Sequence, residues 1–229
     1  MSYLNVTNVS HSFGGRQILE NVSFKLQRGE HVGLVGANGE GKSTFLNIVT
    51  GHVLPDDGKV EWPGKATVGY LDQQSTLQKG MTIREVLHTA FDALYEKEQQ
   101  MLDYYEKMGD ATPEEMDKMM NAVGEIQTEL EHAGFYSLDS KIEEFANGLG
   151  LGSIGLDKDV SELSGGQRSK VLLTKLLLQN SQILLLDEPT NYLDVEHIEW
   201  LTKFLQDYEH AFILISHDVP FLNNVCNVI

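Results

Sequence analysis

The stretch HVGLVGANGEGKST at residues 31–44 decides the fold of this chain. Residues 31–35 form a short, largely apolar run that is typical of a β-strand, and residues 43–50 place apolar side chains at helical spacing. Between them, Gly36 and Gly41-Lys42-Ser43 match the phosphate-binding loop pattern, which is meaningful when a strand precedes it and a helix follows it. We therefore expect a strand, a phosphate-binding loop and a helix in direct succession.

The residue types in this loop suit the binding of a nucleotide. Backbone N–H groups at the start of the helix surround the phosphates. Lys42 reaches the β and γ phosphates, and the Ser43 hydroxyl ligates Mg²⁺. Glu40 is unusual, because a carboxylate repels phosphate unless its side chain points into solvent, as we assume here. The residues predicted to bind the nucleotide are Gly36, Asn38, Gly39, Gly41, Lys42, Ser43 and Thr44.

A second glycine-rich motif, Leu163-Ser164-Gly165-Gly166-Gln167, precedes a helical run of apolar residues. Its free N–H groups therefore lie at the positive end of a helix, which suits a phosphate. The predicted phosphate-binding residues of this motif are Ser164, Gly165, Gly166 and Gln167.

A buried strand at residues 183–188 ends in two carboxylates, Asp187 and Glu188. Acids at the carboxyl end of a parallel strand lie where ligands bind to such sheets. Asp187 is predicted to hold Mg²⁺, and Glu188 to orient and deprotonate an attacking water. Acids after a strand also commonly begin a turn, but the phosphate-binding loop favours the catalytic interpretation.

With both motifs and the two carboxylates in place, the chain resembles an ATP-binding cassette (ABC) ATPase over essentially its whole length. The resemblance implies that the motif at 163–167 contacts the γ-phosphate of ATP held by a partner cassette. It also implies that Gln73 is a catalytic glutamine near Mg²⁺ and the attacking water, and that His217 contacts the γ-phosphate. Phe13 matches the aromatic residue that stacks on adenine, and Asp194 the aspartate of the D-loop.

The resemblance implies an α/β fold of the P-loop NTPase class. Its core sheet would be parallel or mixed, with an antiparallel β subdomain at the N-terminus and an α-helical subdomain. We expect one ATP-binding domain over residues 1–229, with a helical subdomain at 82–150. Val22, Phe24 and Leu26 alternate with polar residues before a turn at 27–29, and this pattern predicts a hairpin with the strand at 31–35.

Residues 82–150 are expected to carry a helical hairpin resembling an arm. Thr82 and Glu85 form a capping box that starts a helix running to Met108, and Thr112 starts a second helix that ends near Ala133. The first helix would be about 39 Å long at 1.5 Å per residue, so the hairpin should project. The alternative is an enlarged helical subdomain with no outward role.

Two branches of the family fit the chain: the ATP-binding subunit of a membrane transporter, and the ABC-F subfamily, whose members carry two cassettes and act on ribosomes. Three features favour ABC-F. Residues 163–171 continue the motif in the ABC-F manner, and residues 187–194 are close to the ABC-F form except that Tyr192 replaces a histidine. Gln73 and Leu163 are also 90 positions apart, more than transporter subunits usually allow. A module that binds nucleotide without hydrolysis is disfavoured by the presence of Glu188 and His217.

The formal net charge is −17, and acidic residues are concentrated in the predicted helical subdomain, where 16 Asp and Glu face 5 Lys and Arg. Such a surface repels nucleic acid at long range. Contacts of the hairpin are therefore expected to use protein partners, or local cations near its tip such as Lys97, Lys107 and Lys118. The N-terminus has no basic segment leading into an apolar run, and we expect a cytoplasmic protein without membrane insertion.

These observations predict a Mg²⁺-dependent ATPase cassette, the first of two, with the second lying beyond residue 229. Its partner would be that second cassette, or another copy of this chain, and its target the ribosome. Two cassettes would close on two ATP molecules and reopen after hydrolysis, so that the nucleotide gates ribosome binding. The chain alone should bind ATP but hydrolyse it poorly.

Overall fold

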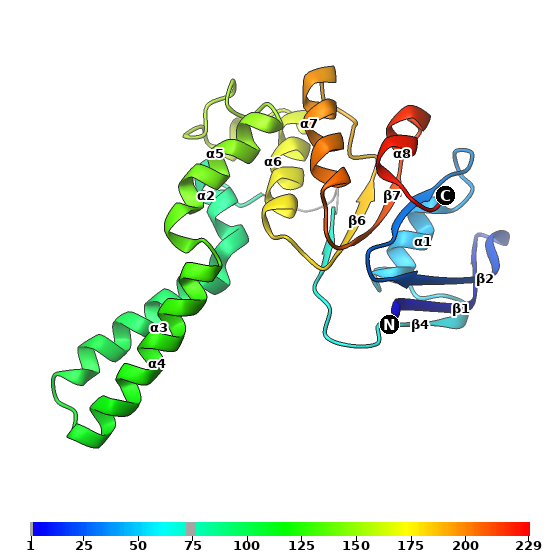
Figure 1. Cartoon of the computed structure of the whole chain (residues 1–229). Coiled ribbons are helices and arrows are strands. Elements are labelled where there is room, and N and C mark those ends of the chain that lie inside the picture. Colours follow the sequence, from blue (N-terminus) through cyan, green and yellow to red (C-terminus); the bar gives the residue numbers. More distant parts are fainter. Residues whose placement is uncertain (1, 72–76) are drawn as a thin grey trace.

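The computed structural model describes residues 2–71 and 77–229 (Figure 1). Its strands are β1 (Ser2–Phe13), β2 (Arg16–Gln27), β3 (His31–Leu34), β4 (Asp57–Glu61), β5 (Val68–Tyr70), β6 (Ile183–Asp187) and β7 (Ala211–Ile215). Its α-helices are α1 (Lys42–Val49), α2 (Ile83–His88), α3 (Asp92–Met108), α4 (Pro113–His132), α5 (Leu138–Gly148), α6 (Gly165–Leu178), α7 (Val195–Gln206) and α8 (Val219–Val225). Short 3₁₀ helices lie at Thr89–Phe91, Phe135–Ser137 and Val160–Glu162.

The described strands form two sheets. An antiparallel sheet has the order β2-β1-β4, and a parallel sheet has the order β3-β7-β6-β5. In the parallel sheet, successive residues of β6 alternate between two cores: Leu184 and Leu186 pack on the helical side, whereas Ile183 and Leu185 face α1 and the antiparallel sheet. This alternation explains why the strand reads as a continuous apolar run. The predicted P-loop α/β fold, with its antiparallel and helical parts, is confirmed.

The predicted hairpin between residues 22–26 and 31–35 is wrong. β2 pairs antiparallel with β1, and β3 pairs in parallel with β7. A turn in which the Glu30 N–H donates to the Gln27 carbonyl oxygen at 3.3 Å separates β2 from β3. β2 alternates between apolar and polar residues because one face is exposed, whereas the apolar β3 needs the doubly covered environment of the parallel sheet.

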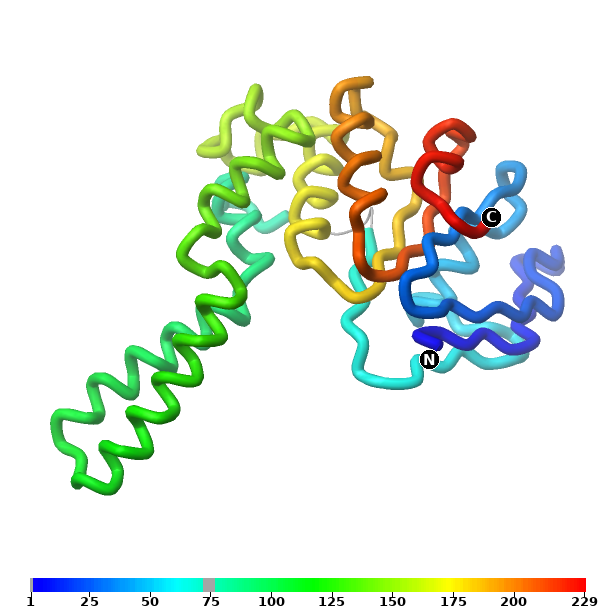
Figure 2. Tube along the Cα trace, viewed as in Figure 1, coloured from blue at the N-terminus to red at the C-terminus, as the bar shows by residue number. Residues whose placement is uncertain are grey.

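Helices α3 and α4 form a hairpin that extends away from the rest of the chain (Figures 1 and 2). The single helix predicted from residue 83 to residue 108 is interrupted by the 3₁₀ turn Thr89–Phe91. Phe91 leaves the helical conformation, with φ −116° and ψ 17°, and its ring is buried in the core beneath the helices. Burial of this ring is the physical reason for the break. Both predicted capping boxes, Thr82 with Glu85 and Thr112 with Glu115, are present.

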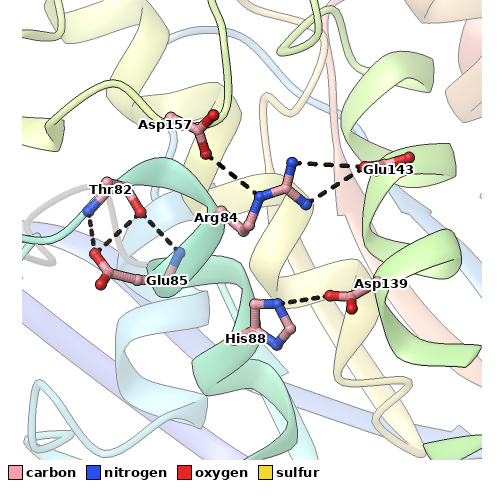
Figure 3. A network of polar contacts seen from close by, with 7 residues as sticks. All are labelled: Thr82, Arg84, Glu85, His88, Asp139, Glu143 and Asp157. Atoms are coloured by element: carbon pink, nitrogen blue, oxygen red, sulfur yellow. Dashed lines mark hydrogen bonds and ion pairs between the residues drawn. The ribbon is translucent and has the colours of Figure 1, made fainter. Parts of the chain in front are cut away.

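A network of polar contacts joins α2 to α5 at the base of the hairpin (Figure 3). Arg84 lies between Glu143, with Nη1 3.4 Å from its Oε1, and Asp157, with Nε 3.5 Å from its Oδ1. His88 adds a contact of 3.0 Å between its Nε2 and Oδ1 of Asp139. These contacts link α2, which precedes the hairpin, to α5, which follows it. Among the described residues, no helix is both long enough and apolar enough to span a membrane.

Candidate nucleotide-binding site

The phosphate-binding loop joins the end of β3 to the start of α1. Gly41 precedes the helix with φ 92°, and a Cβ added there would lie 2.7 Å from Cγ2 of Ile18. Glycine is needed at this position for both the left-handed conformation and the close approach. No side chain caps the first turn of α1, so its N–H groups remain available for an anion.

Two charged side chains of the loop bind the loop itself. Nζ of Lys42 donates to the carbonyl oxygens of Gly36 and Ala37, both at 2.8 Å. Oε2 of Glu40 accepts the Ala37 N–H at 2.7 Å. Glu40 is exposed, in line with our assumption, but its carboxylate binds the backbone of the loop instead of extending away from it. The carboxylate folds back because Ala37 and Glu40 face each other across a turn, in which the Glu40 N–H also donates to the Ala37 oxygen at 3.3 Å.

A cavity of about 260 Å³ lies in front of the loop, at the carboxyl ends of β6 and β7. Its lining combines loop residues with the predicted acids and histidine: Asn38, Gly39, Gly41, Lys42, Ser43, Thr44, Asp187, Glu188 and His217, together with Ile18 and Ile215. Ligands bind to parallel α/β sheets at this edge. The structure thus brings nine of the predicted site residues into one cavity.

Glu188 and His217 contact each other in this cavity. His217 Nε2 lies 3.3 Å from Oε1 of Glu188, and the His217 N–H donates to Oε2 at 3.4 Å. Glu188 has φ 49°, which is uncommon for a residue other than glycine, and its own N–H donates to the Ile215 carbonyl oxygen at 2.9 Å. A carboxylate fixed at both backbone and side chain can act on a water in the cavity without first reorganising.

Ser43 and Asp187 provide oxygen donors of the kind that Mg²⁺ prefers, and both line the cavity. Within the described ranges, no group of three or more His, Cys, Asp or Glu side chains could hold a metal by itself. Mg²⁺ is usually bound by one or two protein groups together with the phosphates of a nucleotide. The residues present therefore fit Mg²⁺ bound jointly with a nucleotide.

The second glycine-rich motif lies at the start of α6, away from the nucleotide cavity. Ser164 caps α6: its Oγ accepts the Gln167 N–H at 3.3 Å, and the Ser164 N–H donates to Oε1 of Gln167 at 3.0 Å. None of the residues 164–167 lines the cavity in front of the loop. A Cβ added to Gly166 would lie 3.1 Å from the ring of Tyr192, which is 65% exposed. The motif therefore forms a separate, exposed surface together with the segment that contains Tyr192.

Two further predicted residues, Phe13 and Gly36, are not among the residues that line the cavity. Phe13, at the end of β1, is 54% exposed and packs edge-on against His11. Gly36 lies in the loop beside Glu40, and Gln73 falls outside the described residues. Sequence reasoning missed Ile18, which lines the cavity from β2. An apolar strand residue carries no local signal for a ligand, so only the packing of β2 on Gly41 reveals it.

This combination of a parallel sheet, a phosphate-binding loop and a carboxylate–histidine pair defines a P-loop ATPase domain. A family model described as "ABC transporter" matches residues 19–191. The chain therefore belongs to this family, as an ABC-type ATPase domain that binds ATP.

Curated relatives cover the whole chain or nearly so. An uncharacterized ABC transporter ATP-binding protein of Bacillus subtilis, YfmM, is 61% identical over 100% of this chain and 44% of its own length. ABC transporter F family member 5 of Arabidopsis thaliana is 36% identical over 100% of this chain and 33% of its own length. The energy-dependent translational throttle protein EttA of Mycobacterium tuberculosis is 36% identical over 95% of this chain and 38% of its own length. The chain thus spans less than half of each.

The solved structure of the ATP-binding subunit of an ABC transporter superposes with a TM-score of 0.69 and 21% identity, covering 98% of this chain and 83% of the other. At this identity the likeness supports the fold alone.

Proposed function

We propose that this chain is an ABC-F-type ATPase cassette, and that ATP-driven closure of two cassettes gates binding to the ribosome in the cytoplasm. The observation that carries the proposal is the hairpin of α3 and α4, which extends from the nucleotide-binding body (Figure 1). Binding ATP does not require such an extension, so the hairpin is available for contact with another molecule. The names of two relatives, an F family member and a translational throttle protein, support the same assignment.

The proposed chemistry uses the side chains of the cavity. Glu188 accepts a proton from the attacking water, and His217 holds the Glu188 carboxylate and contacts the γ-phosphate. Lys42 exchanges its two loop carbonyl oxygens for phosphate oxygens. Mg²⁺, held by Ser43 and Asp187, would neutralise charge on the phosphates.

Two further assignments rest on the family resemblance. Phe13 would stack on adenine, and its exposed ring is free to do so. Gln73 would assist at Mg²⁺ and the attacking water.

Complete ATP sites are proposed to form between two cassettes. The exposed start of α6, with Ser164 to Gln167, would contact the γ-phosphate of ATP bound by the other cassette, and Asp194 would lie at the same junction. That cassette would be in the same full-length protein, or in a second copy of this chain. The chain alone would then bind ATP and hydrolyse it slowly.

Co-sedimentation with ribosomes tests this function. In the full-length protein, Glu188→Gln should retain ATP in the closed form, and the ATP-loaded variant should pellet with ribosomes while the nucleotide-free variant does not. A matched variant, Glu188→Gln with Lys42→Ala, should stay in the supernatant because it cannot bind ATP. If the ATP-loaded Glu188→Gln protein stays off ribosomes, the ABC-F assignment fails. Association with a membrane transporter partner instead would favour the transporter alternative.

A further inference from the structure

A second cavity, of about 450 Å³, lies beside α7 and shares no lining residue with the nucleotide cavity. Four aromatic side chains line it: Phe145 from α5, Trp200 and Phe204 from α7, and Tyr208 from the segment between α7 and β7. We call this cavity the aromatic groove. Its volume falls within the range of typical ligand pockets. The nucleotide chemistry described above makes no use of it.

The aromatic rings of the groove hold one another in fixed positions. Trp200 and Phe204 are stacked, with centroids 5.6 Å apart and planes 10° from parallel. Phe145 packs edge-on against both, at 5.3 Å and 5.4 Å. The Tyr208 hydroxyl donates to the carbonyl oxygen of Ser181, so its polar end already has a partner. Phe145 and Tyr208 are buried, whereas Trp200 and Phe204 are partly exposed, so the ring surface that a ligand can reach comes mainly from α7.

Three exposed carboxylates also line the groove: Glu144, Asp207 and Glu209. In the described part of the chain, none of these carboxylates forms an ion pair or a side-chain hydrogen bond. Lys203 is the one fixed cation among the lining residues. The groove therefore combines a negative field with aromatic faces, and both attract cations.

We infer that the aromatic groove binds an arginine-bearing segment of a partner protein. A guanidinium group is planar, stacks on aromatic rings and is weakly hydrated, so it can lie over the rings while its N–H groups reach the carboxylates. An ammonium group is strongly hydrated and has no flat face to stack. Charge complementarity thus selects a basic segment, and the rings select arginine over lysine. This inference does not depend on the ribosome proposal.

Fluorescence anisotropy of a labelled arginine–glycine repeat peptide, titrated with the full-length protein, tests the site. The charge reversals Asp207→Lys and Glu209→Lys, made together, should weaken binding at least tenfold, because they remove two of the three carboxylates and add two cations. A matched double variant on the hairpin, Glu106→Lys with Glu125→Lys, changes the net charge equally and should bind within about twofold of the unmodified protein. Absence of peptide binding, or equal losses in both double variants, would overturn the inference.

The emission of Trp200 tests whether the peptide enters the groove. The chain has two tryptophans, so a Trp62→Phe background isolates the Trp200 signal within this cassette. Any tryptophan outside residues 1–229 is replaced likewise. The arginine–glycine peptide should change the emission, and a lysine–glycine peptide of equal length should bind at least threefold more weakly. Binding without a change in emission, or equal affinity for both peptides, would contradict the inference. ATP turnover should be unchanged in the Asp207→Lys, Glu209→Lys variant. A loss of peptide binding can then be distinguished from a failure of the proposed ATPase function.

Discussion

The parallel sheet and the helical hairpin differ in how they are stabilised. Every residue of β7 is buried, and in β6 only Asp187 is partly exposed. By contrast, α3 contains no fully buried residue and packs on α4 through partly buried side chains and an ion pair between Lys97 and Glu129. The sheet holds Asp187, Glu188 and His217 at the lining of the nucleotide cavity. The base of the hairpin joins the helical core through Leu130, whereas most side chains of α3 and α4 are exposed or only partly buried.

The largest expected effect is on ATP hydrolysis in the cavity at the parallel sheet. Glu188→Gln keeps the size of the side chain but removes the proton acceptor, so ATP turnover of the full-length protein should fall about 100-fold or more. ATP affinity should change little, because the phosphate contacts of the loop remain. Phosphate release and equilibrium binding of labelled ATP measure the two quantities. Turnover within a few fold of the unmodified protein would remove Glu188 from the reaction.

The next effect concerns nucleotide binding in the same region. Lys42→Ala removes the ammonium group that now bridges two loop carbonyl oxygens, and we expect ATP to bind at least tenfold more weakly. Isothermal titration calorimetry measures the affinity. Lys25→Ala, at an exposed position of β2, removes the same charge elsewhere and is the control. Equal affinities of the two variants would show that Lys42 does not contact phosphate.

A smaller effect is expected in the hairpin. Thr112→Ala removes the side chain that caps α4 and should destabilise its first turn by about 1 kcal/mol. Hydrogen exchange should become faster in the first turn of α4, while ATP turnover stays unchanged because the cap is remote from the nucleotide cavity. Thr112→Ser preserves the capping oxygen and should show normal exchange. A loss of turnover in Thr112→Ala would contradict the separation of the two regions.

The smallest effect is a dependence of this cap on pH. Hydrogen bonds from the Thr112 N–H and hydroxyl lower the pKa of the Glu115 carboxyl below its usual value. The carboxylate therefore stabilises the start of α4 above the unfolded pKa, and this stabilisation is lost as the pH falls through the folded pKa. Hydrogen exchange at the start of α4 should accelerate over that acidic range. Glu115→Gln, which keeps an acceptor but does not titrate, should remove this component of the pH dependence.

The parts of the fold that sequence could predict are those where local chemistry and packing agree. The phosphate-binding loop, the capping boxes of α2 and α4, and the buried strand before Asp187 all carry local signals that the structure reproduces. The pairing of β2 with β1 could not be read locally, because the partner of a strand depends on tertiary contacts. The break at Phe91 was missed for the same reason: its sequence suits a continuous helix, and burial of one ring overrides that preference.

In the candidate site, residues with distinctive chemistry were predictable and those acting through packing were not. Lys42, Asp187, Glu188 and His217 come from motifs, and the structure brings them to one cavity. Ile18, by contrast, is an ordinary apolar residue of β2, and nothing in the sequence near it indicates that it lines the cavity. The contact of Glu40 with Ala37 depends on the turn in the loop, which charge alone does not indicate.

The central claim is that the sheet performs the chemistry while the hairpin selects the partner, and shortening the hairpin tests it most directly. Because Lys97 and Glu129 face each other, residues 102–124 can be replaced by a short glycine–serine turn that joins facing positions. In full-length Glu188→Gln protein, we predict that this replacement leaves ATP binding within about twofold and abolishes co-sedimentation with ribosomes. Ribosome binding that persists at full strength without the distal hairpin would contradict the account.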